Sequence, residues 1–210
     1  MTRASSPGTD MRDRICSAAL ELFASKGFHA SSMRDLAQAV GVEAASLYYH
    51  FPSKQHLLFV LFERTMTDLV VALYTATQAP GTPTERLRNT VRQHVLFHIA
   101  RRDESNISHS ELHALTPENR RLIVSIRDRY ETQMRSLLEE GQQAGEFHMD
   151  DVSVTAIALL TMCSSVSDWI QPRGRLQADA VADLYAQLAL RLVGVQHVAA
   201  LPKTRAAQRE

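Results

Sequence analysis

Hydrophobic residues recur at helical spacing along most of the chain. Between residues 10 and 27 the apolar positions lie three and four residues apart, and the same spacing returns in a short segment that ends at Gly41. A third short helix is predicted from Glu43 to Phe51, and Ser53 then caps a long helix. Almost no stretch shows the alternation of a strand, so the pattern predicts an all-α protein.

The rest of the chain reads as further helices separated by clear breaks. The segments "APGTP", "TPE", "AGEF" and "QPRG" supply the prolines and glycines that end helices. The first nine residues and residues 199–210 are polar, and we expect them to be disordered and flexible, respectively. The predicted helices cover residues 83–102, 118–143, 151–170 and 177–196, with a shorter element at 108–115.

Composition limits the classes of function. The chain has 210 residues, 45% hydrophobic and 22% charged, which is enough to bury a core in one or two domains. Lysine plus arginine equals aspartate plus glutamate, 23 each, so any nucleic-acid contact must be local. The longest apolar run, from Leu57 to Phe62, is too short to span a bilayer, and we expect a cytoplasmic protein without membrane contact. Cys16 and Cys163 lie in separate helical segments and are expected to be small core residues.

The second and third short helices have the spacing of a helix-turn-helix. They are joined by "AVGV", which contains Gly41; Ala37 precedes this glycine by four residues and Leu47 follows it by six. A small residue lets the two helices cross closely, the glycine tolerates a positive φ in the turn, and the leucine anchors the third helix. We therefore predict a three-helix DNA-binding domain over residues 10–56.

The third helix carries aromatic residues that cannot all face the core. Tyr48, Tyr49 and His50 are consecutive and must point in different directions around the helix. The outer face is then free to enter a DNA major groove, where these side chains donate to phosphates and Lys54 neutralises another phosphate. The alternative is that the aromatics only pack between neighbouring helices.

The stretch "ICSAALELFASKGFHASSMRDLAQAVGVEAASLYYHFPSKQHLL" resembles the DNA-binding domain of the TetR family of bacterial repressors. The family often begins its third helix with Ser-Lys-Gly, where this chain has Glu-Ala-Ala, so base contacts would rely on apolar touch or on a carboxylate that reaches a cytosine amino group. Residues 1–54 hold six basic and five acidic side chains, and we therefore expect binding to require a dimer. The resemblance implies DNA contacts by Ser32, Ala44, Ala45, Tyr48, Tyr49, His50 and Lys54. Glu43, where this chain departs from the family, would supply the carboxylate.

Residues 57–198 would form a helical ligand-binding and dimerisation domain. The last two predicted helices, 151–170 and 177–196, carry small and aliphatic residues that would make a four-helix bundle across a two-fold axis. In the second of them the expected seam consists of Val181, Leu184, Tyr185, Leu188 and Leu192. The alternative is that both helices serve only the core of one chain.

A mainly apolar effector cavity is expected among the helices of this domain. Methionines and aromatics at helical spacing are also common core residues, which is the competing interpretation. The expected walls are Phe97, His98, His109, Tyr130, Met134, Met162 and Trp169.

The stretches "ELHALTPENRRLIVSIRDRYE" and "DWIQPRGRLQADAVADLYAQLALRLVG" resemble TetR-type regulators of fatty-acid and steroid breakdown. The resemblance implies an acyl-coenzyme A effector, whose phosphates need cationic partners. A drug-like hydrophobic ligand that controls an efflux gene is the competing effector. The available cationic side chains are Arg101, Arg102, Arg120, Arg121 and Arg127.

Histidines keep an enzyme hypothesis open. His94 and His98 lie four residues apart, as do His109 and His113, with Glu111 between the second pair. This spacing suits a metal site, the lining of a ligand cavity or partly exposed helix histidines. The chain has no nucleophile elbow, phosphate-binding glycine loop or HExxH motif, so we expect a ligand-responsive repressor without catalytic residues or a cofactor.

Overall fold

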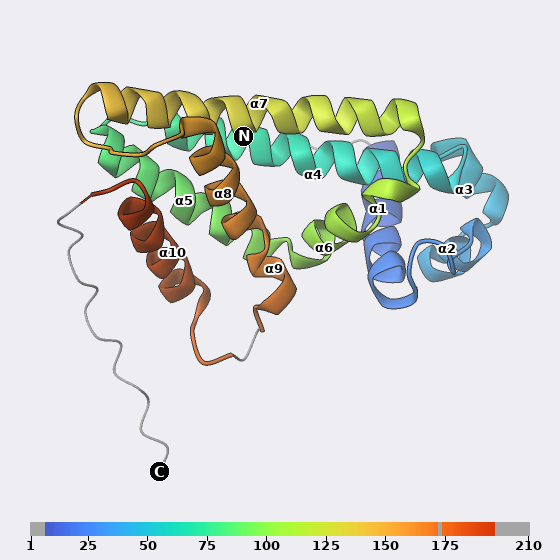
Figure 1. Cartoon of the computed structure of the whole chain (residues 1–210). Helices are drawn as coiled ribbons and strands as arrows, with labels where there is room; N and C mark the ends of the chain where they lie inside the picture. Colours follow the sequence, from blue (N-terminus) through green and yellow to red (C-terminus); the bar gives the residue numbers. More distant parts are fainter. Residues whose placement is uncertain (1–6, 172–173, 196–210) are drawn as a thin grey trace, which may run out of the picture. The chain divides into compact units, whose positions relative to one another are not determined.

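The computed structural model describes residues 7–171 and 174–195, with side chains described from residue 11 (Figure 1). Within these ranges the chain forms helices joined by turns and no strand, which confirms the all-α prediction. Two compact units are present. Unit 1 contains the chain up to Val70 together with Arg101–Arg129, and unit 2 contains Val71–Ala100 together with the chain from Tyr130 onward.

Unit 1 is built around the three N-terminal helices. Leu36, Leu47 and Phe51 are almost completely buried, and α2 packs against α3. Helix α1 packs against α2 and α6. The elements are α1 (Pro7–Lys26), α2 (Met33–Val40), α3 (Ala44–His50), the first part of α4 (Lys54–Thr77), α6 (Arg102–Ser110), the 3₁₀ helix η1 (Leu112–Ala114) and the first part of α7 (Pro117–Gln143).

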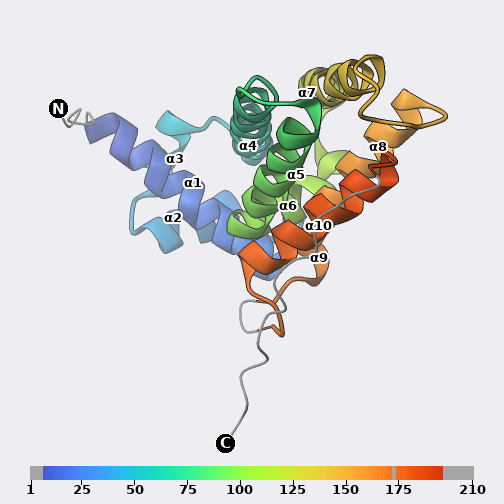
Figure 2. The ribbon, with the colours of Figure 1, turned by 90° about the vertical axis from the view of Figure 1, so that its left-hand side faces the viewer.

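Unit 2 is organised by α5 (Pro83–Ala100), which packs closely against α10 (Ala178–Leu192) (Figure 2). The contacting side of α10 carries buried small residues that let the two backbones approach each other. Arg92 of α5 also binds Asp183 at 2.7 Å and Asp179 at 2.5 Å. Helices α8 (Val152–Ser164) and α9 (Val166–Trp169) pack against α5 as well.

Several boundaries differ from the sequence-based ones. Helix α1 begins at Pro7, earlier than expected, because proline suits the first turn of a helix. The helix expected to continue to residue 102 ends at Ala100, because Arg101 adopts φ −117° and ψ 49°. The helix expected over 151–170 is interrupted at Ser165. Residues 1–6 and 199–210, expected to be disordered and flexible, lie outside the described residues.

The two cysteines are buried, as predicted. Burial raises the pKa of the Cys163 thiol to about 12, so this side chain stays protonated and behaves as a small apolar residue.

One segment, Val152–Trp169, is long and apolar enough to cross a membrane by length and composition, and 33% of it is buried. Core helices of soluble proteins meet the same criterion, so length and composition alone do not identify a membrane-spanning helix. Here the helix stops at Ser164 and restarts at Val166.

Gly141 of α7 provides a test of the packing in unit 2. A methyl group at this position would lie 2.0 Å from the ring of Phe147, which is buried. Gly141→Ala should lower the free energy of unfolding by about 1–3 kcal/mol in urea titrations, although alanine normally favours a helix. Gln143→Ala, at an exposed position of the same turn, should change it by less than about 0.5 kcal/mol. A stabilised Gly141→Ala protein would contradict this packing.

Candidate nucleic-acid interface and effector site

Helix α2 begins with a complete capping box. The Ser32 hydroxyl accepts a hydrogen bond from the Asp35 amide at 3.1 Å, and the Asp35 carboxylate accepts one from the Ser32 amide at 2.8 Å. Lys26 of α1 pairs with the same carboxylate at 3.0 Å. Hydrogen bonds from Lys26 and Ser32 lower the pKa of Asp35 to about 2. Ser32, expected at the DNA backbone, therefore also fixes the start of α2.

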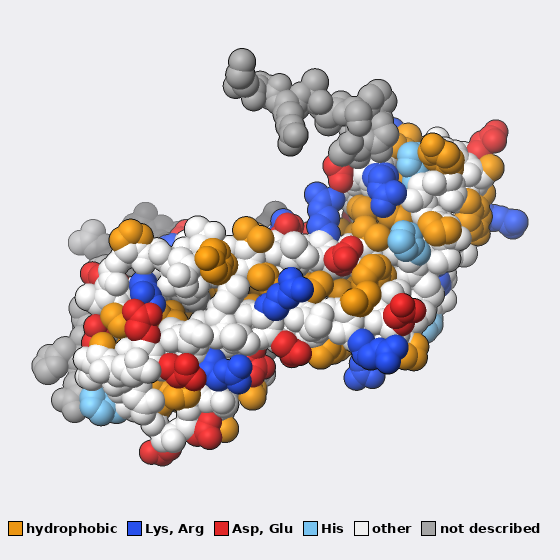
Figure 3. Space-filling view, turned by 90° about the horizontal axis from the view of Figure 1, so that it is seen from above, with side chains coloured by type: hydrophobic (Ala, Val, Ile, Leu, Met, Phe, Trp, Pro, Cys, Tyr) orange, Lys and Arg blue, Asp and Glu red, His pale blue; other side chains and the backbone are white. Residues whose placement is uncertain are grey.

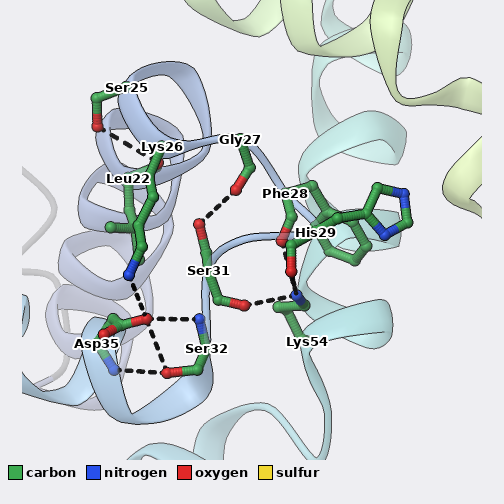
Figure 4. A network of polar contacts seen from close by, with 10 residues as sticks. All are labelled: Leu22, Ser25, Lys26, Gly27, Phe28, His29, Ser31, Ser32, Asp35 and Lys54. Carbon is green, nitrogen blue, oxygen red and sulfur yellow. Dashed lines mark hydrogen bonds and ion pairs between the residues drawn. The ribbon is translucent and has the colours of Figure 1, made fainter.

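Lys54 holds the turn between α1 and α2 (Figure 4). Its ammonium group donates to the carbonyl oxygens of Phe28 and Ser31, both at 2.6 Å, and lies 4.3 Å from the centre of the Phe28 ring. A longer contact of 3.5 Å reaches the His29 carbonyl. Because an ammonium group has three donors, a phosphate contact would require Lys54 to leave a carbonyl. This structural role could not be predicted from local sequence, because the partners of Lys54 lie more than twenty residues earlier in the chain, and the phosphate contact remains a prediction.

Gly41 ends α2 in the left-handed conformation expected for a helix-turn-helix, with φ 77°. Its amide and that of Val42 both donate to the Ala37 carbonyl at 3.0 Å. Ala37 is buried, as its predicted place at the helix crossing requires. The turn thus directs the chain into α3 at a fixed angle.

Helix α3 buries a single side chain, Leu47, and presents the rest outward. Tyr49 is 87% exposed and Tyr48 50% exposed, so neither is a core residue. Their exposure argues against the alternative in which these aromatics only pack between helices. The predicted contact residues Glu43, Ala44 and Ala45 are also exposed, and His50 is half-buried.

Arginines of α1 hold the ends of the two short helices. Arg12 donates to the His50 carbonyl at 3.1 Å and its guanidinium lies 4.6 Å from the centre of the Phe51 ring. Arg14 donates to the Val40 carbonyl at 3.2 Å. Arg34, an exposed cation on α2 next to the capping box, was not among the predicted DNA contacts. Its place in the first turn of the second predicted helix was the signal that could have indicated it.

Basic and acidic side chains are intermixed on the face of the molecule drawn in Figure 3, among the residues described there. This agrees with the equal numbers of basic and acidic residues in the sequence. The face drawn in Figure 3 therefore offers DNA a few local basic groups and not a broad basic surface.

Unit 2 contains a buried polar stripe along α5. Thr90, His94 and His98 are four residues apart and at most 2% exposed. The Thr90 hydroxyl and both ring nitrogens of His94 have no hydrogen-bond partner in the described structure. Burial, and secondarily His98, lowers the pKa of His94 well below its usual value, so the ring is neutral. Buried polar atoms without partners are costly, which makes this stripe a candidate contact for a polar ligand group.

The expected effector residues fall into different surroundings. The Tyr130 ring lies 6.1 Å from the His94 ring, and Phe97 packs edge-on against His98 at 5.7 Å. Met134 is buried and Met162 is half-buried in the same unit. His109 belongs to unit 1 and is exposed.

Trp169 lies at the surface of unit 2. It is 51% exposed and stacks on Tyr185 with ring centres 6.4 Å apart. It lines a hollow of about 240 Å³ together with Ile170, Arg175 and Leu176.

A hollow of about 710 Å³ lies elsewhere in unit 2, where α7 turns into α8 and α10 ends. Phe147, His148, Val154 and Leu192 line it. None of the expected effector residues contributes to this hollow. The buried stripe is the stronger candidate, because the Thr90 hydroxyl and the His94 ring nitrogens lack hydrogen-bond partners.

The five arginines considered for coenzyme A all belong to unit 1. Arg101 pairs with Asp68 at 2.6 Å. Arg120, Arg121 and Arg127 are exposed along α7.

The two histidine pairs also belong to different units. The rings of His94 and His98 are 4.8 Å apart in unit 2, whereas His109 and His113 belong to unit 1. Within the described part of the chain, His113 lies instead with Glu111 and His29, and the potential ligand atoms of these three residues are within 4.8 Å of one another. The sequence analysis missed His29, because it is distant in sequence.

Exposed apolar side chains mark one side of α8 and α10. On α10, Leu184, Leu188 and Leu192 recur every four residues and are 39–50% exposed. Val181, placed on the same stripe by the sequence, is buried instead. Val154 and Ile157 of α8 are 64% and 50% exposed. Such a surface is typical of a protein–protein contact.

Helix α2 is capped at its start and ends at a glycine, and the exposed helix α3 follows it in the chain. This arrangement defines a helix-turn-helix protein. The additional helical unit with a buried polar stripe is typical of a regulator that also binds a ligand.

Comparison with known proteins identifies the family. Residues 15–61 match the family model described as bacterial regulatory proteins, tetR family, and residues 80–193 match the tetracyclin repressor-like C-terminal domain. The chain belongs to the tetR family of bacterial regulators, which confirms the resemblance.

The relatives include regulators of lipid metabolism. The chain is 29% identical to the HTH-type transcriptional repressor KstR2 of Rhodococcus jostii over 85% of its own length and 89% of the relative's. It is 24% identical to the fatty acid metabolism regulator protein of Bacillus subtilis over 75% of its own length and 82% of the relative's.

Two solved structures share the fold. The TetR-family regulator PfmR of Thermus thermophilus is 35% identical, with a TM-score of 0.80 over 85% of this chain and 98% of that one. AibR, solved with isovaleryl coenzyme A and operator DNA, is 27% identical, with a TM-score of 0.77 over 85% of this chain and 97% of that one.

Lys54 provides a test of how the turn between α1 and α2 is held in the helix-turn-helix domain. Lys54→Ala would leave the Phe28 and Ser31 carbonyls without their donor, and should lower the free energy of unfolding by about 1–3 kcal/mol. Hydrogen exchange should show faster exchange of the α2 amides. Lys26→Ala, which removes only an exposed ion pair, should cost at most about 1 kcal/mol. Equal effects of the two changes would contradict the structural role of Lys54.

His94 should make stability depend on pH. Its folded-state pKa is lowered, so below pH 6.5 the unfolded chain binds a proton that the folded chain excludes, and the free energy of unfolding falls. His94→Leu removes this proton uptake and should lose less stability than the wild type between about pH 7.5 and about pH 5.5 in urea titrations. Identical losses in the two proteins would show that His94 takes up a proton equally in the folded and unfolded chains, which would contradict its burial as a neutral ring.

Proposed function

We propose that this chain is a transcriptional repressor that binds a palindromic operator as a homodimer and leaves it when a hydrophobic effector binds. The observation that carries this proposal is the exposed face of α3, held in place by the buried side chains of Leu47 and Phe51. The names of KstR2 and the solved AibR complex support it, since the first is a repressor and the second was crystallised with operator DNA. Such a protein would act in the cytoplasm.

In the proposed complex, α3 lies in the major groove. Tyr48, Tyr49 and His50 would donate to phosphates, and Ala44 and Ala45 would touch base edges. Glu43 would accept from a cytosine amino group. Ser32 would contact the DNA backbone near the start of α2, and to donate there its hydroxyl proton would have to leave the Asp35 carboxylate. Lys54 would fix the turn before α2 and would reach a phosphate only by leaving a carbonyl.

The proposed dimer uses the exposed apolar residues of α8 and α10. Two copies of each helix would form a four-helix bundle around a two-fold axis. The two reading helices would then fit successive major grooves about 34–36 Å apart.

The proposed effector is an acyl-coenzyme A thioester. The neutral ring of His94 can donate to a thioester carbonyl, which would give a partner to one of its unpaired nitrogens. None of the fully buried side chains in the described structure is acidic, so the interior does not favour a cationic drug. The solved complex of AibR with isovaleryl coenzyme A gives further support.

The function is tested by electrophoretic shift with DNA from upstream of the chain's own gene. The protein should shift this DNA, and long-chain acyl-coenzyme A should release it, whereas the free acid and a cationic dye should not. His94→Leu should still bind DNA but need more thioester for release. Release by the dye alone would refute the thioester, and failure to shift any upstream fragment would count against the operator.

Leu188 tests the proposed dimer surface. Leu188→Asp places a charge in the middle of the seam and should give monomers in sedimentation velocity, with loss of operator binding. Leu122→Asp is a matched control, because Leu122 is 48% exposed and Leu188 is 47% exposed. The control should remain dimeric. A dimeric Leu188→Asp protein would rule out this face of α10.

A further inference from the structure

Three side chains with metal-binding chemistry meet in unit 1, apart from the residues proposed to contact DNA or effector. His29 lies in the turn between α1 and α2, and Glu111 and His113 lie at the 3₁₀ helix η1. The potential ligand atoms of these residues all lie within 4.8 Å of one another. Two imidazoles and one carboxylate form a donor set that suits zinc and related transition metals better than magnesium or calcium.

The contacts among the three residues are incomplete without a further partner. His29 Nε2 and Glu111 Oε2 are 4.0 Å apart, which is too long for a hydrogen bond. The Glu111 side chain is 17% exposed, and its Oε2 atom is buried without a hydrogen-bond donor. A buried carboxylate oxygen without a donor is unfavourable, and a cation at this point would stabilise it.

The two imidazoles are arranged side by side and can be reached from solvent. The rings of His29 and His113 are nearly parallel, with centres 6.3 Å apart, and both side chains are exposed. An ion can therefore enter without any opening of the fold.

The backbone on both sides of the group is fixed. Lys54 binds the carbonyls of the turn that carries His29, as Figure 4 shows. The Gln55 side chain donates to the Ala114 carbonyl at 2.7 Å and so holds η1 near the start of α4. Metal–ligand bonds of about 2.0–2.2 Å require the donors to approach one another by roughly 1 Å, which side-chain rotation can supply.

We propose that His29, Glu111 and His113 bind one divalent transition-metal ion such as Zn²⁺, with water completing the coordination. The bound ion would cross-link the turn in front of the helix-turn-helix to η1. Because the unfolded chain cannot assemble this set, binding stabilises unit 1 by mass action. This inference does not depend on the identity of the operator or the effector.

The test uses the full chain, without an affinity tag and freed of metal, titrated with Zn²⁺ by calorimetry and with Co²⁺ by visible absorption. The wild type should bind one ion per chain in the micromolar range or tighter, and Zn²⁺ should raise its Tm. His29→Gln and His113→Gln should each weaken binding by at least on the order of tenfold, and lose the rise in Tm. Both positions are exposed, so the variants should fold.

His148→Gln is the matched control, because His148 is an exposed histidine in unit 2, outside the group. It should bind Zn²⁺ as the wild type does. Binding only at millimolar Zn²⁺, unchanged affinity in His29→Gln and His113→Gln, or an equal loss in His148→Gln would each overturn the proposal. Circular dichroism of the metal-free variants confirms that any loss of binding is not a loss of fold.

Discussion

The orientation of α3 depends on the burial of two side chains, one inside this very short helix and one just after it. Helix α3 spans Ala44–His50, which is too short to be stable alone. Leu47 inside it and Phe51 just after it are completely buried, and the helix packs against α2. Because the anchors occupy one side, the neighbouring residues must face outward. The exposed tyrosines are thus a consequence of how the helix is held.

Unit 2 shows the opposite arrangement, in which polar groups are taken inward. His94 lies in a mostly aliphatic core, where its ring is neutral and both nitrogens lack hydrogen-bond partners. Such a position costs stability unless a ligand completes it. The two units therefore combine a solvent-exposed helix with an interior in which the Thr90 hydroxyl and the His94 ring nitrogens have no hydrogen-bond partner in the described structure.

Local signals predicted most of unit 1. Gly41 and the apolar spacing act within a few residues, so the helix-turn-helix and its outward tyrosines follow from the sequence alone. The role of Lys54 did not follow, because its partners lie more than twenty residues earlier in the chain. His29 was missed for the same reason. In unit 2, periodicity located the helices but could not separate Val181, which is buried, from Leu188, which is exposed. That division depends on which face of α10 meets α5.

The most direct measurement of the central claim compares two exposed tyrosines in operator binding. Tyr49 lies on α3 and is 87% exposed, and Tyr74 lies on α4 in unit 2 and is 56% exposed. If α3 is the reading helix, Tyr49→Ala should weaken operator affinity by on the order of tenfold, the loss of about 1–2 kcal/mol expected for a contact to a charged group, while Tyr74→Ala leaves it unchanged. Unchanged affinity in Tyr49→Ala, or an equal loss in both variants, would contradict the account.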